Sequence, residues 1–306
     1  MTTVVDALAA PLRLRFLALE ITGRCQLTCS SHCYAEAGPT RDHGSMTVDD
    51  WLRIIDEAAA LGTETVQLIG GEPTLSPGFG RLVEHALAAG LRVRVYSNLF
   101  RVSEEHWALF EHPRVRLATS YYSDIAEEHD RITGRTGSHA ATRANIAQAV
   151  RRGVHVSVGV IDMGGGQRAE QARAEMRALG VDEVGVDKVR AVGNAARGAL
   201  PSTSSLCGRC GDGKAAILPT GDVTVCELGR FLTAGSVRDA SLSAVLASER
   251  WADVVASVPR RPGAAPCGPD CSPNDDNCQP SSGGTCGPAS EDGLTYDTTE
   301  EAKRST

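Results

Sequence analysis

The chain has 306 residues, of which 42% are hydrophobic, and its formal net charge is −7. The acidic balance lacks the basic footprint of a nucleic-acid-binding protein, and no apolar run approaches the ~20 residues that span a bilayer, so we expect neither nucleic acid nor membrane as a partner. The N-terminus has no basic region before an apolar one, which excludes a secretory signal and predicts a cytoplasmic protein.

The first 200 residues alternate between strand-like and helix-like segments. Strands are predicted at 14–22, 65–69, 92–97, 115–120, 154–162 and 182–189. Helices are predicted at 47–61, 79–89, 103–110, 141–152 and 169–179. Helices of this length between strands imply parallel pairing with right-handed crossovers. Six such units are too few for a closed eight-stranded barrel, so we expect an α/β fold with a partial (βα)6 TIM-like barrel, whose site lies at the carboxyl ends of its strands.

The ten cysteines fall into two groups on either side of a long cysteine-free segment. The first group is Cys25, Cys29 and Cys33. The second group is Cys207, Cys210, Cys226, Cys267, Cys271, Cys278 and Cys286. Thiols in a chain without an export signal stay reduced, and clustered cysteines there usually bind metal. We therefore expect two metal regions, with a disulfide framework as the alternative for the second.

The first group follows the first predicted strand, and a glycine turn follows the second strand. The residues are Cys25-Gln26-Leu27-Thr28-Cys29-Ser30-Ser31-His32-Cys33-Tyr34 and Gly70-Gly71-Glu72-Pro73-Thr74. This pair of motifs resembles the radical S-adenosylmethionine (radical SAM) superfamily over residues 14–189. The resemblance implies that the three cysteines hold a [4Fe–4S] cluster with one open iron, which S-adenosylmethionine chelates. It also implies that one electron cleaves the sulfonium to a 5′-deoxyadenosyl radical, which abstracts hydrogen from unactivated carbon.

The spacing of these cysteines departs from the superfamily's pattern. Three residues separate both pairs, whereas the usual spacing is three residues and then two. Removing one serine from Ser30-Ser31 would restore the usual pattern, so we interpret the difference as one extra residue in the loop. A zinc site with His32 as a ligand is the alternative, but it explains neither the glycine turn nor the position of the cysteines after a strand.

Further contacts with S-adenosylmethionine are carried over from the resemblance. The turn at 70–73 would bring its backbone to the amino group, because glycine allows close approach. The other expected contacts are Tyr34 beside the adenine, Ser97 and Asn98 near the methionine carboxylate, Ser120 at the ribose, and Arg131 as a bidentate partner of the carboxylate. A core or capping role is the alternative for these side chains.

The C-terminal third has a cysteine spacing of its own. Ten residues separate Cys210 from Gly221 and four more precede Cys226, which resembles the start of the auxiliary-cluster domain (SPASM or its shorter twitch form) of many radical SAM enzymes. Alternating residues at 215–218 and 222–225 predict a β-hairpin that brings Cys210 and Cys226 together. A helix is expected at 242–256. The resemblance implies at least one auxiliary [4Fe–4S] cluster.

Seven cysteines in this region exceed the four that one closed cluster needs. The other three are either ligands of a second cluster or include a hydrogen-atom donor, which would be one of Cys207, Cys267, Cys271, Cys278 and Cys286. The segments that we expect are an N-terminal extension at 1–13, the partial barrel at 14–200, the auxiliary-cluster domain at 201–286 and an acidic tail at 287–306. The tail is polar, which predicts disorder.

These features predict a radical SAM enzyme that tailors a natural product. We expect its substrate to be a ribosomally synthesised peptide that is cross-linked, oxidised or epimerised. The catalytic part begins so near the N-terminus that it leaves no room for a leader-binding domain, which favours the alternative of an epimerase or dehydrogenase acting on an aminoglycoside or other sugar-containing product. A non-enzymatic iron–sulfur electron carrier is a third hypothesis. Carriers need no substrate cavity, whereas six βα units around a glycine turn would supply one. The expected partners are a peptide or small-molecule substrate and a one-electron reductant of the flavodoxin or ferredoxin type.

Overall fold

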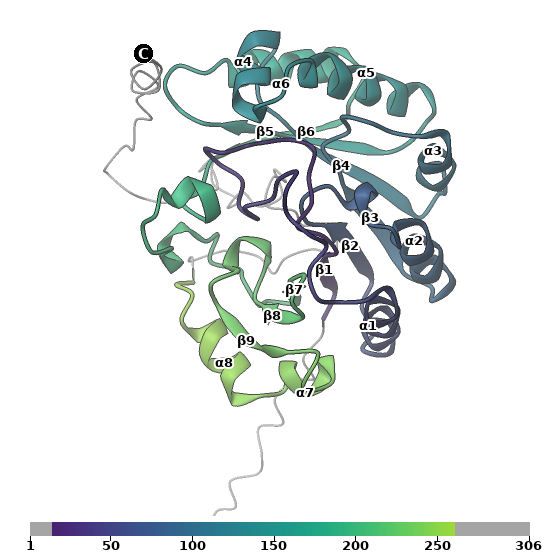
Figure 1. Cartoon of the computed structure of the whole chain (residues 1–306), viewed down its shortest axis with the longest axis vertical. Helices are drawn as coiled ribbons and strands as arrows, with labels where there is room; N and C mark the ends of the chain where they lie inside the picture. Colours follow the sequence, from purple (N-terminus) through teal and green to yellow (C-terminus); the bar gives the residue numbers. More distant parts are fainter. Residues whose placement is uncertain (1–13, 261–306) are drawn as a thin grey trace, which may run out of the picture.

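A nine-stranded sheet forms the centre of the computed structural model, which describes residues 14–260 (Figure 1). Its first six strands are β1 Phe16–Glu20, β2 Thr65–Ile69, β3 Arg92–Tyr96, β4 Val115–Tyr121, β5 Val156–Asp162 and β6 Glu183–Lys188. They pair in parallel with their chain neighbours. The order of the whole sheet is β6-β5-β4-β3-β2-β1-β7-β8-β9, so β6 and β1 are not paired. The predicted open, partial barrel of six parallel strands is therefore confirmed.

The helices that join these strands cover one face of the sheet (Figure 1). They are α1 Val48–Ala60, α2 Phe79–Ala88, α3 Glu104–Phe110, α4 Ala126–Thr133, α5 Ser138–Arg151 and α6 Ala169–Ala178. The start of α1 shows why sequence reasoning succeeds here, because Thr47 and Asp50 form a capping box. Helix α4 was not predicted. Its sequence AEEHDRIT has no apolar stripe, and it buries His129 and Thr133 beside Ile132.

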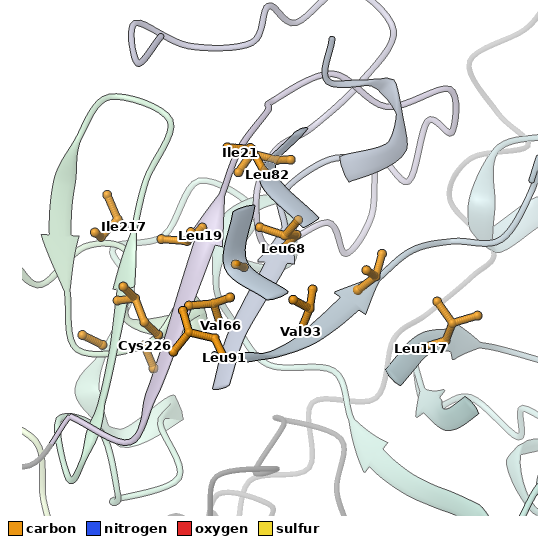
Figure 2. Packing of buried hydrophobic residues seen from close by; sticks show 14 of the residues in the cluster. Leu19, Ile21, Val66, Leu68, Leu82, Leu91, Val93, Leu117, Ile217 and Cys226 are labelled. Atoms are coloured by element: carbon orange, nitrogen blue, oxygen red, sulfur yellow. The ribbon is translucent and has the colours of Figure 1, made fainter. Parts of the chain in front are cut away.

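Alternation along the strands divides the core between the two faces of the sheet. Alternate residues of each strand point to the face that the helices cover. Leu19, Leu68 and Val93 are examples, and they belong to one large apolar cluster (Figure 2). Residues of the other parity, such as Phe16 and Ala18 of β1, belong to a small separate cluster on the inner face. The inner face therefore has space for polar side chains and for a cavity.

The C-terminal strands continue the same sheet. They are β7 Lys214–Ile217, β8 Asp222–Thr224 and β9 Thr233–Ser236, and the β7–β8 pair is the predicted hairpin. Strand β7 also pairs in parallel with β1, which the sequence did not predict. The single helix expected at 242–256 is instead two helices, α7 Leu242–Leu246 and α8 Glu249–Ala256. The break occurs because the hydroxyl of Ser248 caps α8 by accepting from the backbone N–H of Trp251.

Some expectations concern residues outside the described range. These are the extension at 1–13, the acidic tail at 287–306 and the cysteines Cys267, Cys271, Cys278 and Cys286. None of the helices between residues 14 and 260 has the length and apolar character that crossing a bilayer requires.

Replacing Leu68 tests the packing between the sheet and its helices. Leu68 is fully buried in β2, between β1 and β3. We expect Leu68→Ala to lower the free energy of unfolding by about 2 to 5 kcal/mol, because it removes apolar contacts and leaves a cavity. Urea denaturation of the cluster-free chain, followed by circular dichroism, measures the change. Leu200→Ala is the matched control, since Leu200 is 94% exposed, and equal losses in the two variants would contradict the assigned core.

Candidate active site

A cavity of about 180 Å³ opens at the carboxyl ends of the parallel strands. Its wall includes residues at or just after the carboxyl ends of β2 to β6, in agreement with the placement expected for a partial barrel. The predicted site residues that line it are Cys25, Cys29, Cys33, Tyr34, Gly70, Gly71, Ser97, Asn98 and Ser120. The wall is completed by residues 187–190 at the end of β6 and just after it, and by Glu227 and Leu228 of the short helix η4 (Glu227–Gly229). One hollow thus adjoins both the cysteine segment and the C-terminal elements.

The three thiols of the cysteine loop (residues 25–33) are held by local hydrogen bonds. Cys25 Sγ lies 3.4 Å from the backbone nitrogen of Leu27 and 3.5 Å from Asn98 Nδ2, and both donate to it. Cys33 Sγ accepts from the backbone N–H of Ala37 at 3.4 Å. Cys29 Sγ lies 3.7 Å from the carbonyl oxygen of Thr133. Each thiol is therefore oriented by a different segment of the chain.

The longer spacing between Cys29 and Cys33 is accommodated in one tight turn. The backbone N–H of Cys33 donates to the carbonyl of Cys29 at 3.2 Å, and that of Ser30 donates to Thr28 at 2.7 Å. Residues four apart on such a turn lie on the same side, so both cysteines can line the cavity. Ser30 and Ser31 are exposed on this turn. The extra residue thus widens the turn without moving Cys33 away from the cavity.

The surroundings of these thiols disfavour the thiolate form, so without a metal each thiol keeps its proton. Burial, with a smaller contribution from the nearby carboxylate of Glu72, raises the pKa of Cys25 to about 12. Burial also raises the pKa values of Cys29 and Cys33. A thiol in such surroundings loses its proton when it binds a metal, because the metal replaces the proton on the sulfur. Three of them on one cavity wall form a suitable donor set for an iron–sulfur cluster.

The zinc alternative fits this arrangement less well. Nowhere between residues 14 and 260 do three His, Cys, Asp or Glu side chains converge closely enough for a single metal ion. A cubane holds its thiolates farther apart, because each binds a different iron. His32, the expected zinc ligand, places Nε2 2.9 Å from the hydroxyl of Tyr122. Burial lowers the pKa of His32 to about 4, so this ring is neutral.

The turn after β2 packs against the segment that leads into the cysteine loop. Gly70 has φ 133°, and a Cβ there would lie 2.3 Å from the carbonyl oxygen of Thr22. A Cβ on Gly71 would lie 2.3 Å from the carbonyl oxygen of Arg24. Backbone hydrogen bonds join Gly71 to Thr22 at 2.7 Å and Glu72 to Arg24 at 2.8 Å. Close approach between two protein segments therefore requires these glycines, whatever else the turn binds.

Glu72 fastens this turn to the end of β3. One carboxylate oxygen accepts from the Ser97 hydroxyl at 2.9 Å and from the Thr74 hydroxyl at 2.7 Å, and the other accepts from the backbone N–H of Asn98 at 2.8 Å. The side chain is buried, and it caps the short helix η1 (Pro73–Leu75) through the N–H of Thr74. Burial raises the pKa of Glu72, and the donors oppose that effect. Pro73 begins η1 and is itself buried.

The remaining predicted residues differ in their surroundings. Ser97 Oγ is engaged with Glu72 and with the N–H of Leu99, while the Asn98 side chain joins Cys25 to Gln26. Ser120 Oγ lies 3.1 Å from the hydroxyl of Tyr96. Tyr34 packs near Phe16, and its buried hydroxyl makes no hydrogen bond within residues 14–260. Arg131 lies on α4 with 60% of its side chain exposed and does not line the cavity, so it is not brought together with the others.

Sequence reasoning missed a residue that braces the cysteine loop. Asn194 lies in the short helix η2 (Gly193–Ala196) after β6. Its backbone N–H donates to the carbonyl of Cys33 at 3.0 Å, and its Nδ2 donates to the carbonyl of Cys29 at 3.1 Å. One side of the tight turn is thus held by a single asparagine. The only sequence signal was the Gly193-Asn194 pair shortly after the last predicted strand, which is typical of an ordinary turn.

A second group of cysteines converges beside the hairpin. Cys210 Sγ and Cys226 Sγ lie 3.4 Å apart, as the hairpin predicted, and Cys226 Sγ also accepts from the N–H of Gly229 at 3.2 Å. A hydrogen bond with Cys210 lowers the pKa of Cys207, and the cations Arg190 and Lys214 add to this effect. The six cysteines of the described range are all free thiols. Cys207, Cys210 and Cys226 therefore offer a second thiol set.

Comparison with known families identifies the chain. The family model of the radical SAM superfamily matches residues 19–179, which is more than half of the chain. The protein belongs to the radical SAM superfamily. A model described as an iron–sulfur cluster-binding domain, SPASM, matches residues 207–272, C-terminal to it. These two domains imply a catalytic [4Fe–4S] cluster, at least one auxiliary cluster and S-adenosylmethionine as cofactors.

Individual relatives of this radical SAM protein include a maturase and a peptide cyclase. The mycofactocin maturase MftC of Mycobacterium tuberculosis is 34% identical over 152 residues, which are 46% of this chain and 37% of that protein. The PqqA peptide cyclase of Rhodopseudomonas palustris is 30% identical over 139 residues, which are 45% of this chain and 36% of the cyclase. The aligned region thus spans little more than a third of the length of these curated relatives.

A solved structure shows the same fold. Streptococcus suis SuiB, crystallised with the precursor peptide SuiA, superposes with a TM-score of 0.66 at 14% identity. The match covers 80% of this chain and 67% of SuiB. At this identity the likeness establishes the fold, including the strand-rich C-terminal part.

Replacing Asn194 tests how the cysteine loop is braced. Asn194→Ala removes the donor to Cys29 but keeps the backbone donor to Cys33. We expect a loss of about 1 kcal/mol in stability and faster maleimide labelling of Cys29 and Cys33 in the cluster-free chain. Ser103→Ala removes the N-cap of α3, at a similar cost of about 1 kcal/mol, and serves as the control. If both variants are labelled equally fast, Asn194 does not brace the loop specifically.

Proposed function

We propose that this radical SAM enzyme modifies a ribosomally synthesised peptide, by cross-linking, oxidation or epimerisation. The observation that carries the proposal is the single cavity that adjoins both the cysteine loop and the C-terminal elements. The names of MftC and the PqqA cyclase support a peptide as the substrate, and SuiB was crystallised with a precursor peptide. No observation of comparable weight favours a sugar.

We assign the catalytic cluster to Cys25, Cys29 and Cys33. They line the cavity, and each is oriented by a different segment. A set of three thiolates leaves one iron open for S-adenosylmethionine. The auxiliary cluster is assigned to Cys207, Cys210 and Cys226, with further ligands from Cys267, Cys271, Cys278 and Cys286 beyond the described residues. In this assignment the partial barrel extends over 14–200 and the auxiliary domain over 201–286.

The S-adenosylmethionine contacts are proposed around the same cavity. Tyr34, Gly70, Gly71, Asn98 and Ser120 all line it. The buried hydroxyl of Tyr34 has no partner within residues 14–260 and could bond to a ligand there. The hydroxyl of Ser97 is already used by Glu72, so we assign Ser97 and Glu72 to holding the strand end in place. Arg131 is left out of this set because its side chain does not reach the cavity.

When bound, the [4Fe–4S] cluster and S-adenosylmethionine would supply the one-electron cleavage and the hydrogen abstraction that this superfamily performs. The chain's own part is to hold the reacting groups and to exclude water. The apolar part of the wall, where a carbon radical has few competing partners, is formed by Leu27, Ile69, Tyr96, Tyr122 and Ile161. Oxidation or a cross-link would require the substrate to give one further electron to the auxiliary cluster and to release a proton, whereas epimerisation would require a hydrogen atom from a thiol.

The cavity also distinguishes an enzyme from an electron carrier. A carrier needs only a path for electrons, whereas this chain has a cavity of about 180 Å³ beside the thiols. We therefore propose a substrate-binding role for residues 187–190, which form the wall at the carboxyl end of β6.

Removing the first cysteine group tests the assignment of the catalytic cluster. We expect a variant with Cys25, Cys29 and Cys33 all replaced by alanine to form no 5′-deoxyadenosine, because the open iron would be lost. Iron should remain at the C-terminal region, as measured by iron analysis and by the visible absorption of the cluster. Loss of all iron from this variant would contradict two separate cluster regions. Cys226→Ala is the complementary control and should remove auxiliary iron while slow S-adenosylmethionine cleavage persists.

A substrate assay tests the proposed peptide chemistry. Reconstituted enzyme is incubated anaerobically with S-adenosylmethionine, a reductant and a candidate precursor peptide encoded beside its gene. We expect the peptide either to lose two hydrogens, which indicates oxidation or cross-linking, or to keep its mass and gain one deuterium from heavy water, which indicates epimerisation. Mass spectrometry reads both outcomes. Turnover of an aminoglycoside in place of every such peptide would overturn the peptide proposal but leave the radical SAM assignment intact.

A further inference from the structure

Arg230 reaches from the C-terminal region to the strand that leads into the cysteine loop. It directly follows the short helix η4, and its Nη1 donates to Oε2 of Glu20, the last residue of β1. Glu20 is fully buried, and only 24% of the Arg230 side chain is exposed. A buried carboxylate is costly unless it is paired, so this ion pair holds Arg230 in one place. The contact joins residues that are 210 positions apart in the sequence.

The same guanidinium lies over the ring of Tyr34, the residue after Cys33. Arg230 Cζ is 5.9 Å from the centre of that ring, which is within the range of a cation–π contact. Tyr34 lines the cavity, whereas Arg230 does not. Any effect of Arg230 on the cavity is therefore exerted through a neighbour that lines it, and the ring of Tyr34 is such a neighbour.

Main-chain contacts fix the backbone of Tyr34 but not its ring. A Cβ on Gly193, whose φ is 59°, would lie 2.4 Å from the carbonyl oxygen of Tyr34 and 2.5 Å from that of Cys33. The backbone at 33–34 is therefore packed tightly against η2. The hydroxyl of Tyr34 has no hydrogen-bond partner within residues 14–260, so it does not anchor the ring. The ring is instead oriented by the small apolar cluster of the inner face and by the guanidinium of Arg230.

We propose that Arg230 is a positioning residue for S-adenosylmethionine, because it holds the ring of Tyr34 in the orientation against which the adenosyl group packs. The inference rests on the contact between Tyr34 and S-adenosylmethionine that is proposed above. Arg230 takes no part in the chemistry, and its effect is on the affinity for the cofactor. In this arrangement the C-terminal region serves the barrel in two ways, by offering a second thiol set and by completing the cofactor site.

Replacing Arg230 tests this role by cofactor binding. We expect Arg230→Met to raise the Kd of the reconstituted enzyme for S-adenosylmethionine about fivefold or more, because the ring loses the cation on its face. Anaerobic equilibrium dialysis measures the Kd, and the change that S-adenosylmethionine causes in the electron paramagnetic resonance spectrum of the reduced cluster should weaken in parallel. Arg230→Lys keeps a cation at this position and should retain most of the affinity. Glu20→Gln combined with Arg230→Met avoids an unpaired buried carboxylate, and this folded variant should bind the cofactor as weakly as Arg230→Met.

A double-mutant cycle shows whether Arg230 acts through Tyr34. We expect Tyr34→Leu alone to weaken cofactor binding, and the addition of Arg230→Met to cause little further loss, because the ring through which the arginine acts is gone. Additive losses would overturn the proposal. Unchanged binding in Arg230→Met beside weakened binding in Tyr34→Leu would overturn the role of Arg230 alone. Unchanged binding in Tyr34→Leu would refute the cofactor contact proposed for Tyr34, and the present inference with it.

Arg152→Met is the matched control, because Arg152 makes the same kinds of contact away from the site. It pairs with Glu104 and Glu111, its Cζ lies 5.2 Å from the ring centre of Trp107, and 28% of its side chain is exposed. It follows α5 directly, and neither Arg152 nor these partners line the cavity. We expect Arg152→Met to leave the Kd for S-adenosylmethionine unchanged. Equal weakening in the Arg152 and Arg230 variants would mean that the loss of an ion pair acts through general stability, which would overturn the proposal.

Discussion

The buried carboxylate of Glu72 is the contact on which the geometry of the site depends. It accepts hydrogen bonds from Thr74 and Ser97 and from the backbone of Asn98, so that the turn after β2 and the end of β3 are held as one unit. Hydrogen bonds to a charged group contribute about 1.5 to 3 kcal/mol each, and they offset part of the cost of burying the carboxylate, although burial still raises the pKa of Glu72. Because Asn98 in turn donates to Cys25, the position of this thiol follows from that of Glu72.

The cysteine loop is braced from its other side by elements that arrive much later in the chain. Asn194 bonds to the carbonyls of Cys29 and Cys33, and Thr133 bonds to the loop at Thr28. The loop is thus fixed by hydrogen bonds to two separate connections, the one between β4 and β5 and the one after β6. This explains how a spacing one residue longer than the common pattern can be tolerated. The additional residue enlarges a solvent-exposed turn, while the carbonyls at its two ends remain anchored.

The sequence predicted the strands and most helices because each has a strong local signal. Buried strands such as 65–69 are short apolar runs, and α1 begins at a capping box. Helix α4 was not predicted, because its sequence is polar and its burial depends on contacts with α5. The residues 25–33 and 70–73 were found from a family motif, whereas Asn194 was not, because its role arises only where a distant crossover meets the loop. The pairing of β7 with β1 likewise depends on tertiary packing that no local pattern encodes.

That pairing also fixes where the two thiol sets stand relative to each other. The strand that leads into the cysteine loop is hydrogen bonded directly to the hairpin of the auxiliary region, and the buried ion pair of Lys214 with Glu227 reaches across to Gln67 of β2. The two thiol sets are therefore built on one continuous piece of sheet, with no hinge between them. The distance between a cluster at the first set and a cluster at the second would consequently be set by the pairing of β1 with β7 and would stay the same whatever occupies the cavity.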